Sequence, residues 1–307
     1  WVTRALREAL VGHGRPADEL AALLHADNEA PKVTLVARPG LVEPDELAEQ
    51  VGADATPGRW APTAVTLAGG DPASLAAVRD GRAGVQDEGS QLVALALAAA
   101  PLDGGDERWL DLCAGPGGKA ALLAALAAEQ GARLVANEVQ PHRARLVERA
   151  LAAVPDGSVE EVRVGDGREV GENEPGGYDR VLLDAPCTGL GALRRRPESR
   201  WRRTPTDLAA LSALQRDLLA SALRAVRVGG LVGYVTCSPH LAETRMAVVD
   251  ARRAAAKAGL GVEVVDARAV LLAVAPGLDL PEREDVQLWP HVHGTDAMHL
   301  TLLRRTA

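Results

Sequence analysis

The sequence lacks several features that define common structural classes. It has no Phe and only 3 Cys among 307 residues. It also has no run of about 18 apolar residues that could cross a membrane. No charged segment followed by an apolar one opens the chain, so no secretion signal is predicted and a cytoplasmic location is expected. An odd number of cysteines without such a signal argues against a disulfide framework, and their spacing is not that of a zinc site.

Lysine is also scarce, because the 34 basic residues include only Lys32, Lys119 and Lys257. This bias is typical of a GC-rich genome. A lysine that is retained in such a sequence therefore suggests that its position requires a lysine side chain. The net charge of −8 argues against a general nucleic-acid binder, although it leaves room for a local basic groove. The hydrophobic content of 47% is ordinary for a globular protein.

Two regions differ in their pattern. Residues 1–80 predict a small α+β subdomain, with helices at Trp1–Leu10, Ala17–His25 and Pro44–Val51 and strands at Val33–Ala37 and Thr63–Leu67. Residues 81–307 alternate helices with strands, the strands being expected at Arg108–Leu112, Arg133–Asn137, Glu161–Val164, Arg180–Leu183, Leu231–Val235, Gly261–Val265, Val286–Trp289 and Met298–Leu303. This alternation predicts a Rossmann-like α/β domain whose mostly parallel sheet ends in an antiparallel edge.

A glycine-rich turn, Asp111 to Lys119, follows the first of these strands and opens a helix. It is imperfect as a nicotinamide fingerprint and fails as a phosphate-binding loop, because position 120 is Ala; a purely structural turn is the simplest alternative. Glu138 ends the next strand, where it could bind ribose hydroxyls, and Asp166 ends the third, where it could meet an adenine amino group. Three such strand ends favour a nucleoside ligand.

Two cysteines stand at corresponding places after neighbouring apolar strands. Cys187 lies in an Asp-Ala-Pro-Cys sequence and Cys237 in a Thr-Cys-Ser sequence. Since parallel strands end at one edge of a sheet, both thiols are expected near the glycine turn. Cys113, inside that turn, is expected to pack as a small buried residue.

A thiolate beside a methyl donor fits methylation at carbon 5 of a pyrimidine. That carbon is a poor nucleophile until a thiolate adds to carbon 6; it can then attack a sulfonium methyl group, and loss of its proton expels the thiol. Asp184, three residues before Cys187, could support the addition near the ring nitrogen and amino group.

These motifs together resemble the RNA 5-methylcytosine methyltransferases of the RsmB (Fmu/Sun) type over nearly the whole chain. They are Trp1-Val-Thr-Arg-Ala-Leu6, Val85-Gln-Asp-Glu-Gly-Ser90, Asp111-Leu-Cys-Ala-Gly-Pro-Gly-Gly-Lys119, Asp184-Ala-Pro-Cys187, Thr236-Cys-Ser238 and Leu288-Trp-Pro-His-Val-His-Gly-Thr-Asp296. The family often carries a helical NusB-like domain, which is absent from these residues or lies upstream of Trp1.

The resemblance implies a class I methyltransferase that uses S-adenosylmethionine, with Cys237 as nucleophile and Cys187 assisting product release. It implies active-site roles for Asp184 and Lys119 and an RNA-recognition-like role for residues 1–80. The residues implied to bind S-adenosylmethionine are Cys113, Ala114, Gly115, Pro116, Gly117, Gly118, Lys119, Glu138, Arg143, Asp166 and Asp184. The implied substrate is a cytidine in RNA, with small-subunit ribosomal RNA expected and a single-stranded or looped target favoured.

A basic stretch after Cys187 is expected to contact RNA phosphates, and a solvated loop is the alternative. Its arginines are Arg194, Arg195, Arg196, Arg200, Arg202 and Arg203. His291 and His293 are two apart on an expected strand and are interpreted as structural, so no metal is predicted. A monomer with no membrane partner is expected.

Two other functions stay open on the sequence alone. In DNA cytosine-5 methyltransferases the Pro-Cys thiol is the nucleophile, and a second Thr-Cys thiol is not expected. The other is an RNA-binding ribosome-assembly factor that keeps the fold without turnover, against which the intact Asp184, Cys187 and Cys237 argue.

Overall fold

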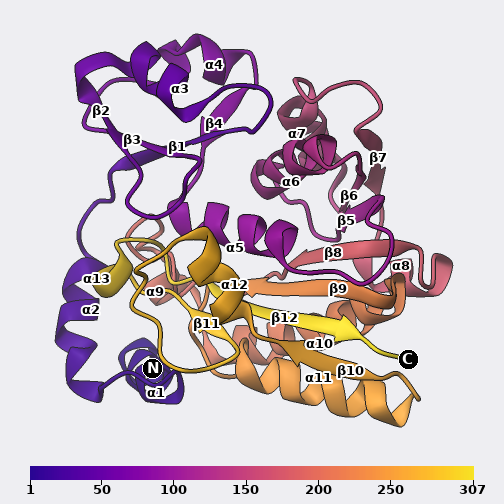
Figure 1. Ribbon diagram of the computed structural model, residues 1–307. Coiled ribbons are helices and arrows are strands. Elements are labelled where there is room, and N and C mark those ends of the chain that lie inside the picture. Colours follow the sequence, from indigo (N-terminus) through magenta and orange to yellow (C-terminus); the bar gives the residue numbers. More distant parts are fainter.

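The computed structural model describes residues 1–307 and contains two sheets (Figure 1). The small sheet has the order β2-β3-β1-β4 and is antiparallel throughout. Its elements are β1 Val33–Ala37, α3 Pro44–Val51, β2 Ala55–Pro57, β3 Ala64–Leu67, α4 Ala76–Arg79 and β4 Ala83–Val85, with short 3₁₀ turns at Gly52–Asp54 and Pro72–Ser74. Leu35 and Val65 pack with Leu47 of α3 and Ala77 of α4 in one core, so the helices cover one face of the sheet.

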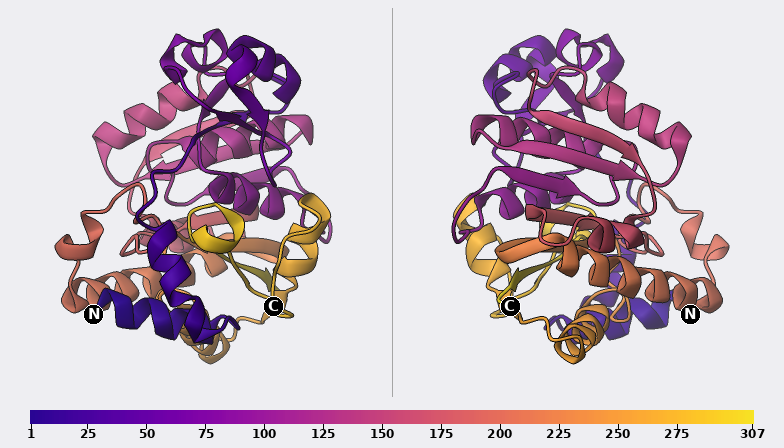
Figure 2. Two further views of the ribbon diagram at one scale, coloured as in Figure 1. Left: turned by 90° about the vertical axis from the view of Figure 1, so that its left-hand side faces the viewer. Right: turned by 90° about the vertical axis from the view of Figure 1, so that its right-hand side faces the viewer.

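The first two helices lie apart from this sheet. They are α1 Val2–Gly12 and α2 Leu20–Ala26, joined through a 3₁₀ turn at Ala17–Glu19. Leu6, Leu10 and Leu23 pack with Leu193 and Trp289 of the large unit, and Figure 2 shows both helices remote from the small sheet. The single subdomain predicted for residues 1–80 is therefore corrected in two ways. Its helices up to residue 26 belong with the large unit, and its sheet continues to Val85, because β4 completes the hydrogen bonding of β1.

The large sheet has the order β10-β12-β9-β8-β5-β6-β7, with β11 paired to β12. Strands β5 to β9 are mutually parallel, and β12 runs antiparallel to its neighbours. The strands are β5 Arg108–Asp111, β6 Arg133–Glu138, β7 Val159–Val164, β8 Tyr178–Asp184, β9 Val226–Thr236, β10 Val262–Val265, β11 Val286–Gln287 and β12 His299–Arg305. The mostly parallel sheet with an antiparallel edge, predicted from the sequence, is confirmed.

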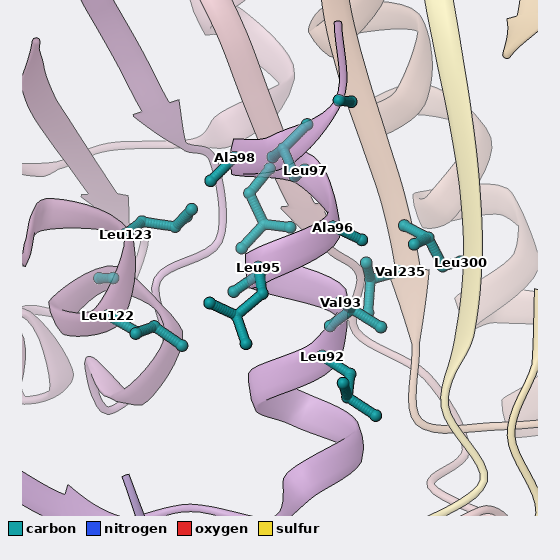
Figure 3. Close-up of a cluster of buried hydrophobic side chains, with 14 of the residues drawn as sticks. Leu92, Val93, Leu95, Ala96, Leu97, Ala98, Leu122, Leu123, Val235 and Leu300 are labelled. Carbon is teal, nitrogen blue, oxygen red and sulfur yellow. The ribbon is translucent and has the colours of Figure 1, made fainter. Parts of the chain in front are cut away.

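Helices cover both faces of this sheet. They are α5 Glu88–Ala99, α6 Gly118–Glu129, α7 Pro141–Leu151, α8 Gly167–Asn173, α9 Ser199–Arg202, α10 Pro205–Ala225, α11 Arg245–Lys257, α12 Ala267–Val274 and α13 Pro290–His293. Side chains alternate along the strands. Val235 packs against α5, in the same core as Leu122 and Leu123 of α6 (Figure 3), whereas Tyr234 packs with α10 and α11 on the other face of the sheet. No helix is long and apolar enough to span a membrane.

The segment around His291 differs from its prediction. His291 and His293 lie in helix α13, because Pro290 occupies a first helical position after Trp289, and strand β11 ends at Gln287. The Nδ1 atom of His293 accepts from the Trp289 backbone N–H, and its Nε2 lies 3.1 Å from the Asp279 carbonyl oxygen. Both nitrogens of His293 therefore have partners, which supports the structural interpretation of this side chain.

Candidate active site

The glycine turn links β5 to α6 at the carboxyl edge of the large sheet. Gly117 has φ +97°, and a Cβ there would lie 2.8 Å from Ala150 Cβ and 3.0 Å from Val147 Cα. Gly115 has φ +57°, and its Cβ would lie 3.0 Å from Arg143 Nη2. Glycine is thus required both by the left-handed backbone and by the close approach of α7.

Asn137 forms hydrogen bonds that link the ends of three strands next to this turn. Its side-chain amide donates to the carbonyl oxygens of Leu112 and Gly165, each at 3.1 Å, and its backbone carbonyl oxygen accepts from Ala114 N at 2.9 Å. Asn137 therefore holds the turns after β5, β6 and β7 in a fixed relation.

The acidic residues predicted at the strand ends differ in their availability. Glu138 is buried: one carboxylate oxygen accepts from Gln140 N at 2.9 Å, and the other lies 3.9 Å from Arg143 Nη1. Asp166 caps α8 and is paired with Arg168 at 2.5 Å, which lowers the pKa of its carboxyl group. Glu138 keeps a free acceptor, whereas a ligand at Asp166 would share that carboxylate with Arg168.

Asp111, the first residue of the glycine turn, is a further residue of the site that its motif alone did not indicate. Its Oδ1 accepts from Cys113 N at 3.3 Å, and its buried Oδ2 has no hydrogen-bond partner. Burial, with the nearby negative charge of Asp184, raises the pKa of Asp111 to about 7. An orphaned buried oxygen of this kind is expected to meet a hydrogen-bond donor from a ligand. The thiol of Cys113 is itself shielded, and burial raises its pKa well above the ordinary value.

Lys119 and Asp184 form an ion pair at the edge of the same site. The Lys119 Nζ atom lies 2.8 Å from Asp184 Oδ2 and donates to Ser90 Oγ at 3.2 Å. Burial opposes the charged form of Lys119, but the attraction of the Asp184 carboxylate outweighs it and raises the net pKa. The only lysine of the glycine turn therefore carries a fixed positive charge here.

The two cysteines meet beyond the ends of β8 and β9. Their Sγ atoms are 3.3 Å apart, and both thiols are free. The hydrogen bond between them lowers the pKa of Cys237, helped by the charge of Lys119, and raises the pKa of Cys187 well above its ordinary value. Cys237 is therefore the more acidic of the two thiols.

A buried carboxylate outside the sequence motifs holds the Cys187 loop. Glu243 is 0% exposed and accepts from Thr188 N at 2.8 Å, from Gln215 Nε2 at 3.1 Å and from the Thr188 hydroxyl. Gln215 also donates to Pro186 O at 2.8 Å, and Thr188 Oγ1 lies 3.1 Å from Ser238 Oγ. This network joins the loop of Cys187 to that of Cys237. No sequence signal marks Glu243, because its partners are distant along the chain.

The arginine stretch divides into paired and exposed members. Arg194 and Arg195 form ion pairs with the buried carboxylates of Asp87 and Asp296, at distances between 2.7 and 3.1 Å. Their predicted role as phosphate contacts is corrected, because these charges are already neutralised within the protein. Among the others, Arg200 donates to the Asp27 carbonyl at 2.7 Å, Arg203 is half-buried, and Arg196 and Arg202 are exposed.

The chain is similar to known methyltransferases in sequence and in structure. The family described as 16S rRNA methyltransferase RsmB/F matches residues 96–304. A Mycobacterium tuberculosis protein, whose provisional name describes it only as a methyltransferase, is 55% identical over 305 residues, which are 99% of this chain and 63% of that protein. Ribosomal RNA small subunit methyltransferase B of Photorhabdus laumondii is 33% identical over 223 residues, which cover 70% of this chain and 50% of that protein. The chain thus spans less than two thirds of the length of either relative.

Solved structures share the fold of this chain. The crystal structure of the protein PH0851 has a TM-score of 0.81 at 27% identity, covering 97% of this chain and 65% of that one. NSun6 from Pyrococcus horikoshii shares the fold, with a TM-score of 0.75 at 17% identity, and the match covers 99% of this chain and 98% of that one. The family match covers more than half of the sequence, including the glycine turn and both cysteines. The chain therefore belongs to the RsmB/F family of 16S rRNA methyltransferases.

Proposed function

We propose that the protein transfers a methyl group from S-adenosylmethionine to carbon 5 of a cytidine in RNA, with small-subunit ribosomal RNA as the first candidate. The observation that carries this proposal is the pair of thiols 3.3 Å apart, in which Cys237 is the more acidic, beside the Lys119–Asp184 ion pair. A pyrimidine ring needs such an acidic thiol for addition at carbon 6.

The residues around the glycine turn fit S-adenosylmethionine. Glu138 has a carboxylate oxygen free to accept from ribose hydroxyls. Asp111 Oδ2 has no hydrogen-bond partner, and a donor group of the bound ligand could satisfy it. Gly115 and Gly117 let the backbone approach a ligand without Cβ atoms in the way. When bound, S-adenosylmethionine would supply the electrophilic methyl group.

The Cys237 thiolate forms a bond to carbon 6, and the electron pair of the ring double bond makes carbon 5 nucleophilic. After carbon 5 gains the methyl group, a base removes its proton, and the carbon–sulfur bond to Cys237 breaks as the double bond returns. Cys187 remains protonated because its pKa is high. Its S–H donates to the departing sulfur and stabilises the thiolate. Cys237 therefore acts in the addition to carbon 6, and Cys187 assists the release of the product.

A polar cleft at the small sheet suits the RNA segment that flanks the target base. Its volume is about 300 Å³, and it lies between the small sheet and the Arg194–Arg195 segment. Thr34, Thr56 and Thr66 are register partners across β1, β2 and β3 and line the cleft with the exposed Lys32 and Arg59. Hydroxyl groups and unpaired cations are suited to the sugar–phosphate backbone of RNA.

The test uses labelled S-adenosylmethionine with unmodified small-subunit ribosomal RNA or with DNA, followed by mapping of the modified base. The parent chain is expected to label carbon 5 of cytidine in RNA. The Cys237→Ala variant is expected to lose transfer, whereas Cys187→Ala should accumulate an RNA adduct that resists denaturation. Val249→Ala, at an exposed position of α11, serves as the control. Labelling of DNA would favour a DNA methyltransferase, and binding of RNA without transfer would favour an assembly factor; either result contradicts the proposal.

A further inference from the structure

Three side chains with metal-binding atoms, none of them part of the glycine turn or of the thiol pair, meet at a buried point. His13 follows α1, Asp285 precedes β11 and His299 begins β12. One donor atom from each lies within 4.8 Å of the other two. His13 is 1% exposed and His299 is 0% exposed, so both rings are shielded from solvent.

The hydrogen bonds of His13 fix which ring nitrogen carries the proton. Its Nε2 atom lies 3.1 Å from the carbonyl oxygen of Pro239 and 3.2 Å from Thr244 Oγ1. The Thr244 hydroxyl donates its own proton to His240 O at 3.0 Å. Both neighbours of Nε2 are therefore acceptors, so Nε2 is the N–H donor, and the Nδ1 atom of the neutral ring carries a lone pair.

That lone pair points at another acceptor. His13 Nδ1 lies 3.7 Å from Asp285 Oδ2, which is longer than a hydrogen bond. Neither of these two atoms nor His299 Nδ1 has a hydrogen-bond partner. The other ends of the side chains are held, since Arg283 donates to Asp285 Oδ1 and His299 Nε2 lies 3.0 Å from Thr301 Oγ1. When His299 Nε2 donates to Thr301 Oγ1, His299 Nδ1 also carries a lone pair. A cation between the three unpartnered atoms would then satisfy all of them.

We propose that His13, Asp285 and His299 bind a divalent first-row transition metal, with Zn²⁺ as the first candidate. Two imidazole nitrogens and a carboxylate oxygen form a ligand set typical of zinc, and a water would complete four-coordination. Two ligands at the usual zinc distances lie about 3.4 Å apart around a tetrahedral ion, close to the 3.7 Å observed between His13 and Asp285. The donation from His13 Nε2 to a carbonyl is the outer-shell bond that orients a metal-binding histidine.

The position of this site indicates a structural role. The ion would tie the segment after α1 to β12, which are far apart in the sequence. His13 also contacts the carbonyl of Pro239, two residues after Cys237, and the hydroxyl of Thr244, next to Glu243. The metal would therefore also stiffen the loop that carries the candidate nucleophile.

The test measures bound metal in tag-free protein and its response to added Zn²⁺. The parent chain is expected to hold about one zinc ion per chain and to gain thermal stability when Zn²⁺ is restored after chelation. Two single variants remove one ligand each: Asp285→Asn, which keeps the side-chain shape, and His299→Gln. Each should lose both the bound ion and the thermal response to Zn²⁺. The control is His25→Ala, because His25 is exposed on α2.

Substitution with Co²⁺ gives a second measurement on the parent chain alone, so the proposal stays testable even where a variant does not fold. Visible bands typical of a four-coordinate cobalt site with nitrogen and oxygen ligands are expected. A parent chain that holds no zinc and gives no such bands would overturn the proposal, because a proton shared by His13 and Asp285 would then fill the gap. Zinc retained by Asp285→Asn and His299→Gln would also overturn it, since the ion would lie elsewhere.

Discussion

Replacing Glu243 tests whether a buried carboxylate holds the Cys187 loop in place. Glu243 accepts two hydrogen bonds from Thr188 and one from Gln215. In Glu243→Ala the N–H of Thr188 is left buried without a partner, and three bonds to a charged acceptor are lost. An orphaned buried donor costs about 1–3 kcal/mol, and loss of the remaining bonds with a new cavity raises the total to about 3–5 kcal/mol.

The matched variant Glu243→Gln should cost much less. Its carbonyl oxygen can accept from Thr188 N and Gln215, while its amide group donates to Thr188 Oγ1, which then donates to Ser238. Every polar atom keeps a partner, so the expected loss is about 1 kcal/mol. Urea unfolding of the parent and both variants measures these differences.

The kinetics of methyl transfer show whether Glu243 positions the Cys187 loop or only stabilises the fold. Below the temperature at which Glu243→Ala unfolds, its kcat should fall by about tenfold or more, because the Cys187 loop is misplaced by a small distance. Its KM for S-adenosylmethionine should stay within about twofold, since the glycine turn is untouched. Equal unfolding free energies for the Ala and Gln variants, or a loss of less than about 1 kcal/mol for Ala, would refute the reasoning.

Three further predictions follow from the same geometry. Transfer should rise with pH as the Cys237 thiolate forms, and Cys187→Ala should move the rise of adduct formation to higher pH, because the hydrogen bond that lowers the Cys237 pKa is lost; an unmoved pH profile would contradict this. Gly117→Ala should lower the unfolding free energy by about 2–4 kcal/mol, measured by urea unfolding, because it combines a left-handed backbone with a Cβ 2.8 Å from another; a change below about 1 kcal/mol would contradict it. Lys32→Ala combined with Arg59→Ala should weaken RNA binding and reduce the slope of log affinity against log salt by about 1.4, at about 0.7 for each phosphate contact to a single strand; an unchanged slope would place the RNA elsewhere.

The sequence was most informative where a residue's role depends on its local segment. The alternation of helices and strands predicted the parallel sheet, and apolar strands followed by Cys187 and Cys237 predicted that the two thiols meet at one edge. The strand pairing confirms the sheet, and the 3.3 Å separation of the sulfur atoms confirms that the thiols meet. The division of roles between the cysteines, the monomeric state and the cytoplasmic location stay predictions.

Contacts between distant segments could not be predicted in this way. The apolar faces of α1 and α2 gave no indication of which partner they cover, so the first helices were assigned to the wrong unit. The basic stretch showed a cluster of positive charges but not the carboxylates that pair with them. Asp87 and Asp296 are distant in the sequence, and only the fold brings them to Arg194. Glu243 lies 55 residues from Thr188, so no spacing links them.

The central claim is that Cys237, and not Cys187, forms the covalent bond to the target base. The direct measurement is peptide mass spectrometry of the protein after reaction with RNA that contains 5-fluorocytidine, in which carbon 5 carries no proton to lose and the adduct persists. The modified peptide of the parent chain and of Cys187→Ala is expected to carry the nucleotide on Cys237, and Cys237→Ala is expected to give no adduct. A nucleotide attached to Cys187, or an adduct in Cys237→Ala, would contradict the account.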